Sequence, residues 1–383
     1  MTICPSKHSL DKLFIGSHFI WLHEMVMTVD GNRADIRSWT IMRGIAALAV
    51  VLFHFKIHVA YPIASIPILG PIIFHGDLGV DMFFILSGFV MTYVYDLPVP
   101  GTRFDFRKFY IRRIARIYPI HVITLLGAFV MLAAGGVLGF VQVDRSQLLW
   151  AVPTQLLLLH GIVPDTAPTL NYPSWSVSSE MFAYLLFPGF ALLYRIVRYP
   201  VLLAVASMAM LYVMMDATSL GAFGAIRVST EFILGMGLCL MLRDRHSRIV
   251  GSAVMALGFA IFIIAVNLNS YRSIAILGLA VAISGAFVGH QERPATLPIR
   301  MLTYLGQISY SLYMVHALIE APGFRVAQIV TGVPKDQHGL GVLALMVVAA
   351  IVAASLLYHI VEQPCRHMIV AYADRRSRGG KHQ

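Results

Sequence analysis

Residues 43–55 read RGIAALAVVLFHF, an apolar run that begins with an arginine and carries a histidine near its end. Extended to residues 41–60, this run is long enough to cross the ~30 Å hydrocarbon core of a bilayer as an α-helix. Arg43 and His54 are eleven positions apart, and eleven steps of about 100° return two side chains to one face of a helix. Because polar side chains are costly inside a bilayer, we expect this face to line a polar cavity.

The composition of the chain is that of a membrane protein. Of its 383 residues, 58% are hydrophobic and only 13% are charged, whereas soluble globular domains carry about 25% charged residues. The formal net charge of +10 is explained by basic residues that orient cytoplasmic loops. Without a basic, aromatic-rich surface domain, we expect no nucleic-acid partner. The three cysteines are too few and too scattered for a disulfide framework or a zinc site.

Apolar runs of spanning length predict an all-α polytopic membrane protein with about ten transmembrane helices. The loop at 61–77 has no lysine or arginine, whereas the segment 97–116 is rich in both, so the positive-inside rule places the first outside and the second inside. Continued along the chain, this rule places both termini in the cytoplasm. The ten expected spans lie near 41–60, 78–96, 117–139, 177–194, 199–216, 227–242, 249–267, 273–289, 301–320 and 339–362.

An eleventh apolar run, residues 147–163, is shorter and is expected not to cross. The loops on its two sides carry only Arg145 between them. If the run crossed the membrane, one of these loops would have to be cytoplasmic, against the positive-inside rule. We therefore expect a re-entrant or interfacial helix on the outer face.

Acidic and histidine side chains gather at middle to outer depth. Asp81, in the second expected span, lies at a depth similar to that of His54, and a carboxylate beside an imidazole orients it and raises its basicity. The alternative for Asp81 is an interfacial helix cap. Glu180 lies about one turn inside the fourth span, where Ser176 or Ser178 is expected to cap the helix.

A polar stripe runs along the expected span 301–320. Ser309, Tyr313, His316 and Glu320 are spaced to share one helix face. Such a face is too polar for lipid and predicts a cavity toward the outer side.

Arginines gather at the opposite, cytoplasmic end. Arg113 and Arg116 are one helical turn apart, and two guanidinium groups on one face suit a phosphate ligand, which each can bind with two hydrogen bonds. Arg43 lies at the cytoplasmic mouth of the first span. Taken singly, each of these arginines is also typical of a residue that anchors a helix end at the interface.

Six segments between about residues 40 and 368 resemble, in the same order, the motifs of the acyltransferase-3 family of integral membrane acyltransferases. Members of that family modify sugars and related acceptors, and they include O-acetyltransferases of O-antigen and exopolysaccharide, succinyltransferases of periplasmic glucans and macrolide acyltransferases. The matching segments are RGIAALAVVLFHF with its Arg-x10-His pattern, GDLGVDMFFILSGFV, RRIARIYP, PSWSVSSEMFAYLLFP, LGQISYSLYMVH and VEQPCR.

The resemblance implies a multi-pass protein of the inner (plasma) membrane that takes acyl-CoA from the cytoplasm as donor. It implies transfer, with acetyl as the expected group, to a hydroxyl of an extracytoplasmic or lipid-linked glycan. The domain limits expected on this basis are an N-terminal extension at 1–38, disordered or interfacial, a membrane acyltransferase domain at 39–366 and a basic cytoplasmic tail at 367–383.

The residues and the resemblance together suggest roles for nine side chains. His54 is expected to act as general base, or else as a transient acyl carrier, because attack of a hydroxyl on a thioester needs a base near neutrality. We expect neither a permanently bound cofactor nor a metal. The assigned roles are catalytic for His54, Asp81 and Glu180, CoA-phosphate binding for Arg43, Arg113 and Arg116, and substrate binding for Trp175, Ser176 and His316.

Two other classes of protein fit parts of the pattern. A proton-coupled transporter or flippase of glycan precursors would also use buried His, Asp and Glu side chains. A transporter has no need of a CoA-phosphate site, so acyl-CoA binding separates these two functions. A non-catalytic membrane scaffold would not need the buried charges at all.

Overall fold

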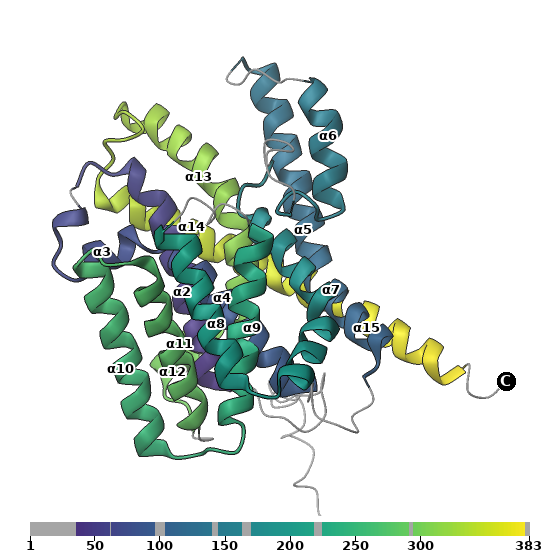
Figure 1. The fold of residues 1–383 in the computed structure, drawn as a ribbon. Coiled ribbons are helices and arrows are strands. Elements are labelled where there is room, and N and C mark those ends of the chain that lie inside the picture. Colours follow the sequence, from purple (N-terminus) through teal and green to yellow (C-terminus); the bar gives the residue numbers. More distant parts are fainter. Residues whose placement is uncertain are drawn as a thin grey trace, which may run out of the picture. The chain divides into compact units, whose positions relative to one another are not determined.

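The computed structural model describes residues 36–61, 63–95, 104–139, 145–162, 170–217, 224–290 and 294–379. Regular structure within these ranges is helical throughout (Figure 1), apart from a single β-bridge between Val59 and His338. The expectation of an all-α protein is therefore confirmed. Residues 1–35, which make up most of the expected N-terminal extension, lie outside the described residues.

The described residues form a succession of α-helices with short 3-10 and π-helical turns among them. In chain order they are α2 (Arg37–Phe55), η1 (Lys56–His58), η2 (Ile63–Ser65), α3 (Leu69–Phe74), α4 (Leu78–Tyr95), α5 (Phe106–Val137), α6 (Arg145–Leu156), α7 (Ser174–Val197), α8 (Pro200–Tyr212), η3 (Val213–Ala217), α9 (Gly224–Leu242), α10 (Arg248–Asn267), α11 (Arg272–Val288), α12 (Leu297–Gln307), α13 (Ser309–Thr331), α14 (Leu340–Leu357), η5 (Tyr358–Glu362) and α15 (Gln363–Gly379).

Within the described residues, seven helical stretches are long and apolar enough to cross a membrane, and α8 and α11 are apolar but shorter. These findings agree with a polytopic membrane protein; the count of ten spans and the side of each terminus stay predictions. The seven stretches are Arg37–His58, Leu78–Tyr95, Phe106–Val137, Ser174–Val197, Gly224–Leu242, Arg248–Asn267 and Leu340–Arg375.

Two expected segments differ in detail. The span expected at 301–320 is interrupted at Ile308, where α12 ends and α13 begins. Gly306, two residues before the interruption, has its backbone against that of α2. The apolar run 147–163 forms the helix α6 over only its first part, and a helix of this length, at 1.5 Å per residue, is too short to span the ~30 Å core.

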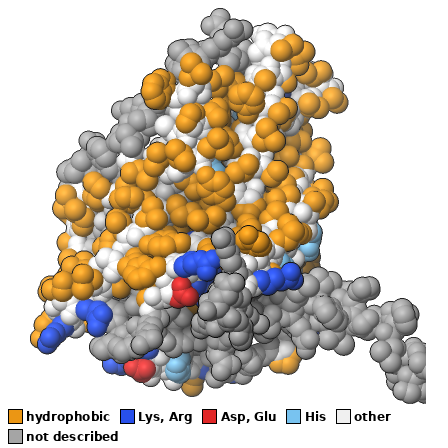
Figure 2. Space-filling view, turned by 90° about the vertical axis from the view of Figure 1, so that its right-hand side faces the viewer, with side chains coloured by type: hydrophobic (Ala, Val, Ile, Leu, Met, Phe, Trp, Pro, Cys, Tyr) orange, Lys and Arg blue, Asp and Glu red, His pale blue; other side chains and the backbone are white. Residues whose placement is uncertain are grey.

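The surface of the helices carries the apolar belt that a bilayer requires. Large hydrophobic side chains are exposed along α10 and α14, among them Ile249, Leu257, Leu345 and Val352. Figure 2 shows one face covered with hydrophobic side chains, with lysine and arginine side chains gathered along one edge of it. In water such a surface would aggregate, whereas lipid tails cover it at no cost.

Close backbone contact joins α4 to α9. Gly88 of α4 lies against the Phe232 carbonyl of α9, and Gly235 of α9 lies against the Ile85 carbonyl of α4. A Cβ built on Gly88 would stand 2.0 Å from that oxygen, so only glycine allows the two helices to approach this closely. Small residues commonly serve this purpose between membrane helices. The contact matters for the site, because α4 supplies one of its walls.

Gly88→Ala should destabilise the protein, because the added methyl group must push α4 and α9 apart. Overpacking of this kind typically costs ~1–3 kcal/mol, which a lowered midpoint of thermal unfolding of the detergent-solubilised protein would report. Gly341→Ala in α14 is the matched control, since its Cβ would meet nothing within 4 Å. Equal midpoints for the two variants would contradict the tight contact.

Candidate functional site

A pocket lies among α2, α4, α5, α7 and α13, with about 780 Å³ of empty space including its open mouth. Polar and charged side chains from five of the six family-like segments meet in it. Its lining consists of Arg43, Val80, Phe83, Phe84, Leu86, Ser87, Val90, Met91, Arg113, Arg116, Ile117, Ser176, Val177, Glu180, Tyr184, Ser309, Tyr310 and Tyr313.

Three arginines line this pocket. Arg43 comes from α2, whereas Arg113 and Arg116 come from successive turns of α5. Arg113 is buried, and its guanidinium lies 5.7 Å from the ring centroid of Tyr184. Its Nε has no hydrogen-bond partner within the described part of the chain. A buried cation with an unused donor beside a cavity favours an anionic ligand.

A further arginine, Arg366 at the start of α15, is close enough to Arg113 and Arg116 to interact with both electrostatically. The carboxylate of Glu362, which accepts a hydrogen bond from Ser311, is the nearby countercharge. Sequence reasoning gave Arg366 no role. Its position four residues after Glu362, inside a family motif, was the available signal.

Glu180 of α7 is held in place by two hydroxyl groups. Ser87 of α4 and Tyr184 of α7 both donate to Oε1 of Glu180. Ser87 lies next to Gly88, so the close contact of α4 with α9 also positions this donor. The arrangement fixes the direction of a carboxylate that lines the same pocket as the arginines.

The serines at the start of α7 do not cap it, contrary to expectation. The N-cap residue is Pro173, and no side chain caps the helix. Ser176 donates instead to the Pro173 carbonyl and shares a 2.6 Å hydrogen bond with the Tyr313 hydroxyl. Ser178 donates to the Leu158 carbonyl. These serines tie α7 to α13 and to the segment after α6, which a helix-cap pattern does not foresee.

His54 lies outside this lining, in a second group of polar side chains. Its Nδ1 is 2.9 Å from the Val50 carbonyl, one turn back in α2. That carbonyl can only accept, so the neutral ring carries its proton on Nδ1 and leaves a lone pair on Nε2. Nε2 has no hydrogen-bond partner among the described residues. This is the tautomer that a general base needs.

The second group surrounds His54 with aromatic rings. The ring centroids of Tyr172 and His316 lie 4.8 Å and 5.1 Å from that of His54. Tyr313 connects the group to the pocket, since it lines the pocket and its ring centroid is 5.9 Å from that of His316. The Glu320 carboxylate acts on His54 electrostatically and is hydrogen-bonded to His58 and to Tyr172.

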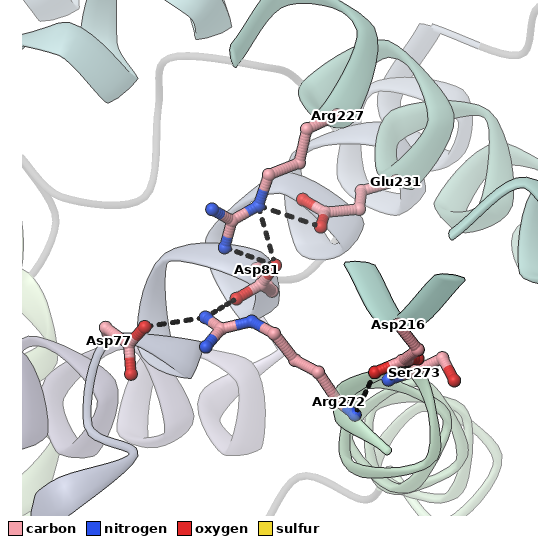
Figure 3. A network of polar contacts seen from close by, with 7 residues as sticks. All are labelled: Asp77, Asp81, Asp216, Arg227, Glu231, Arg272 and Ser273. Carbon is pink, nitrogen blue, oxygen red and sulfur yellow. Dashed lines mark hydrogen bonds and ion pairs between the residues drawn. The ribbon is translucent and has the colours of Figure 1, made fainter. Parts of the chain in front are cut away.

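Asp81 was expected beside His54 but is bound elsewhere. Its Oδ1 accepts from Nε and Nη2 of Arg227 at 3.0 Å and 2.6 Å. Its Oδ2 lies 3.3 Å from Nη2 of Arg272, which also binds Asp77 at 2.7 Å. Figure 3 shows the two guanidinium groups approaching Asp81 from opposite sides. The fully buried carboxylate therefore neutralises arginines of α9 and α11 and does not orient the histidine.

Further polar contacts lie beside the two arginines. Glu231 of α9 lies 3.5 Å from Nε of Arg227, and Asp216 accepts the backbone N–H groups of Arg272 and Ser273 at the start of α11 (Figure 3). The guanidinium of Arg227 also lies 5.9 Å from the Trp175 ring. Trp175, expected to bind substrate, thus has its ring near a cation and is absent from the lining of the pocket.

Neither arginine of this network was given a role from the sequence. Arg227 and Arg272 begin expected spans at ends that the positive-inside rule assigns to the outer face. A basic residue at an outer end departs from that rule, and this departure was the available signal for a buried acidic partner.

Asp81→Asn should destabilise the protein strongly. Removing one member of a buried ion pair leaves the other charge uncompensated, at a typical cost of ~3–5 kcal/mol. Thermal unfolding of the purified protein measures the loss. Asp336→Asn, an exposed position in the loop before α14, is the control. If both variants unfolded at the same temperature, the network would not hold these helices together.

Comparison with known proteins gives three findings. Residues 36–359 match the acyltransferase domain that defines the acyltransferase-3 family. The acyltransferase MdmB of Streptomyces mycarofaciens is 29% identical over 372 residues, covering 87% of this chain and 92% of that protein. The Bacillus subtilis protein named "Putative peptidoglycan O-acetyltransferase YrhL" is 26% identical over 368 residues, covering 85% of this chain but 54% of that longer protein. No solved structure matches.

Proposed function

The chain belongs to the acyltransferase-3 family, and we propose that it is a membrane O-acyltransferase that uses acyl-CoA. The donor is taken from the cytoplasm, and the acceptor is a hydroxyl of an extracytoplasmic or lipid-linked glycan at the inner (plasma) membrane. Acetyl is the proposed acyl group, in keeping with the name of the Bacillus subtilis relative.

The observation that carries this proposal is the arginine-lined pocket. Arg43 of α2 and Arg113 and Arg116 of α5 line one cavity with Glu180 of α7. CoA brings several phosphate groups on a long, flexible arm, and guanidinium groups are the side chains best suited to bind them. Positive-inside topology assigns the same helix ends to the cytoplasm, where acyl-CoA is available.

His54 supplies the base in this proposal. Its Nε2 lone pair takes the proton of the acceptor hydroxyl while the oxygen attacks the thioester carbon. The new C–O bond forms, the C–S bond breaks, and the proton passes from Nε2 to the departing sulfur. Along α2, eleven residues at 1.5 Å each place His54 ~16 Å from Arg43, a distance that the pantetheine arm of CoA spans.

Replacing both Arg113 and Arg116 by Gln should weaken acyl-CoA binding at least tenfold, with little change in apparent affinity for the acceptor. Each charge-assisted contact to phosphate contributes ~1.5–3 kcal/mol, and Gln keeps polarity but loses the charge and the paired donors. Replacement by Lys should restore only part of the affinity, because an ammonium group cannot bind bidentately. Titration of the purified protein with CoA measures these affinities.

Arg195 and Arg198 provide the control for this titration. They are exposed at the end of α7, lie on the same expected side of the membrane, and are absent from the lining of the pocket. Changing both to Gln removes the same net charge and should leave CoA affinity unchanged. If wild type and the Arg113/Arg116 variant bound CoA with equal affinity, these arginines would not form an acyl-CoA site. That result would favour the transporter or flippase.

His54→Ala should abolish acyl transfer while leaving CoA binding intact, because loss of a general base removes ~10²–10⁴-fold in rate. The measurement is transfer of radiolabelled acyl groups to cell-surface glycan in membranes. His75→Ala is the matched control, since the Nδ1 of His75 makes the same contact with a carbonyl one turn back, at 2.9 Å. A His54 variant that keeps more than about a tenth of the wild-type rate would exclude the base role.

A further inference from the structure

Three side chains beside His54 form a continuous line of hydrogen bonds. His316 Nδ1 lies 2.7 Å from the Tyr313 carbonyl, and His316 Nε2 lies 3.0 Å from the Tyr172 hydroxyl. The same hydroxyl lies 2.7 Å from Oε2 of Glu320. His316 is fully buried. Tyr172 comes from the turn before α7, whereas the other two come from α13.

Each of these three contacts needs a proton between its heavy atoms. The Tyr313 carbonyl can only accept, so Nδ1 of His316 must carry a proton. One more proton must lie between Nε2 and the hydroxyl oxygen, and another between that oxygen and Glu320. A neutral imidazole, a phenol and an ionised carboxylate supply two protons in total. The line therefore requires one proton more than these ordinary forms hold.

Tyr172 does not change charge when the extra proton is present or absent. Burial, together with the adjacent Glu320 carboxylate, raises the pKa of Tyr172 well above its ordinary value. The phenol oxygen keeps one covalent proton and accepts a second through its lone pair. The extra proton thus resides either on His316 or on Glu320, with Tyr172 between them.

We propose that His316, Tyr172 and Glu320 form a proton chain that holds one shared proton beside His54. In one form, imidazolium His316 donates from Nε2 to the phenol oxygen, and the phenol donates to ionised Glu320. In the other, the carboxylic acid of Glu320 donates to the phenol oxygen, and the phenol donates to Nε2 of neutral His316. Going from the first form to the second breaks the Nε2–H bond of His316 and the O–H bond of Tyr172, and it makes a new O–H bond at Tyr172 and one at Glu320. Both forms have zero net charge.

The groups around the chain fit both forms. His58 approaches the other oxygen of Glu320, Oε1, at 2.9 Å, where Nε2–H of His58 donates in either form. His54, whose ring centroid is 5.1 Å from that of His316, faces the chain from α2. Lys56 and Asp77 act on His54 electrostatically with opposite signs. None of these groups supplies the missing proton to the line itself.

The proton chain has a role in catalysis if His54 is the base, and this role rests on the proposed function. When His54 takes the proton of the acceptor, a positive charge forms next to His316. A shift of the shared proton from His316 to Glu320 moves positive charge away from His54 without any ion entering or leaving. Tyr172 and Glu320 are thus positioning residues that act on His54 through His316.

The presence of the shared proton can be measured without any assay of activity. The full chain, labelled with ¹⁵N-histidine and ¹³C-glutamate in nanodiscs, is studied by NMR at neutral pH, with His316→Gln and Glu320→Gln to assign the two signals. We expect either two protonated ring nitrogens at His316 or a protonated carboxyl at Glu320. A neutral His316 together with an ionised Glu320 would overturn the proposal.

Tyr172→Phe removes the central oxygen and should release the shared proton, leaving neutral His316 and ionised Glu320. Tyr110→Phe, which loses a hydroxyl contact to a backbone carbonyl on the outside of α5, should leave both signals unchanged. An extra proton that persists in Tyr172→Phe would exclude a proton chain through the Tyr172 hydroxyl.

Activity gives an independent readout of the same variant. Without the shared proton, the side chains of the proton chain together carry a net negative charge, which favours the protonated form of His54. The acid limb of the pH–rate profile of Tyr172→Phe should therefore move to higher pH, and that of Tyr110→Phe should not. An unmoved limb would exclude the action on His54. If wild type showed no transfer at all, the proposed function would fail, while the NMR result would still decide whether the shared proton exists.

Discussion

A charge buried among membrane helices must either be paired or face a cavity, and this constraint separates the structural from the functional charges of the protein. An unpaired charge at the bilayer centre costs several kcal/mol even on insertion scales. Asp81 meets the constraint by pairing with Arg227 and Arg272. Arg113 meets it by lining a pocket, with a donor left unused. The first arrangement holds helices together, whereas the second is the one that we propose to bind an anion.

The paired charges support the pocket mechanically. Asp81 is carried by α4, the helix that also supplies Ser87 to Glu180 and Gly88 to the contact with α9. Pairing with arginines at the starts of α9 and α11 therefore fixes one end of a pocket wall, and the glycine contact fixes its middle. Arg227 extends the same support to Trp175 at the start of α7. The residues of the pocket are thus oriented by contacts outside it.

Much of this arrangement could be predicted from the sequence, because the position of a residue along a membrane-spanning helix determines its depth in the membrane. Hydropathy and loop charge predict helices, and helical spacing places Arg113 beside Arg116. The meeting of Arg43, Arg113, Arg116, Ser176 and Glu180 in one pocket agrees with the motifs, although what the pocket binds stays a proposal.

The partners of buried residues could not be predicted, because they depend on which helices touch. Arg227 and Arg272 lie 146 and 191 positions from Asp81, and no periodicity relates such distances. The turn that brings Tyr172 to Glu320, and the interruption at Ile308, arise from close contacts between helices. Asp81 was expected beside His54 only because the two residues lie at similar estimated depths. Depth alone does not say which residues are neighbours.

The central claim is that the arginine-lined pocket holds the donor with its phosphates at Arg113 and Arg116. The most direct measurement is an experimental structure of the full chain with a non-hydrolysable acyl-CoA analogue. We expect phosphate oxygens within hydrogen-bond distance of both guanidinium groups, and the acyl end beyond Tyr313 on the side of His54. An analogue bound with its phosphates away from both arginines would contradict it.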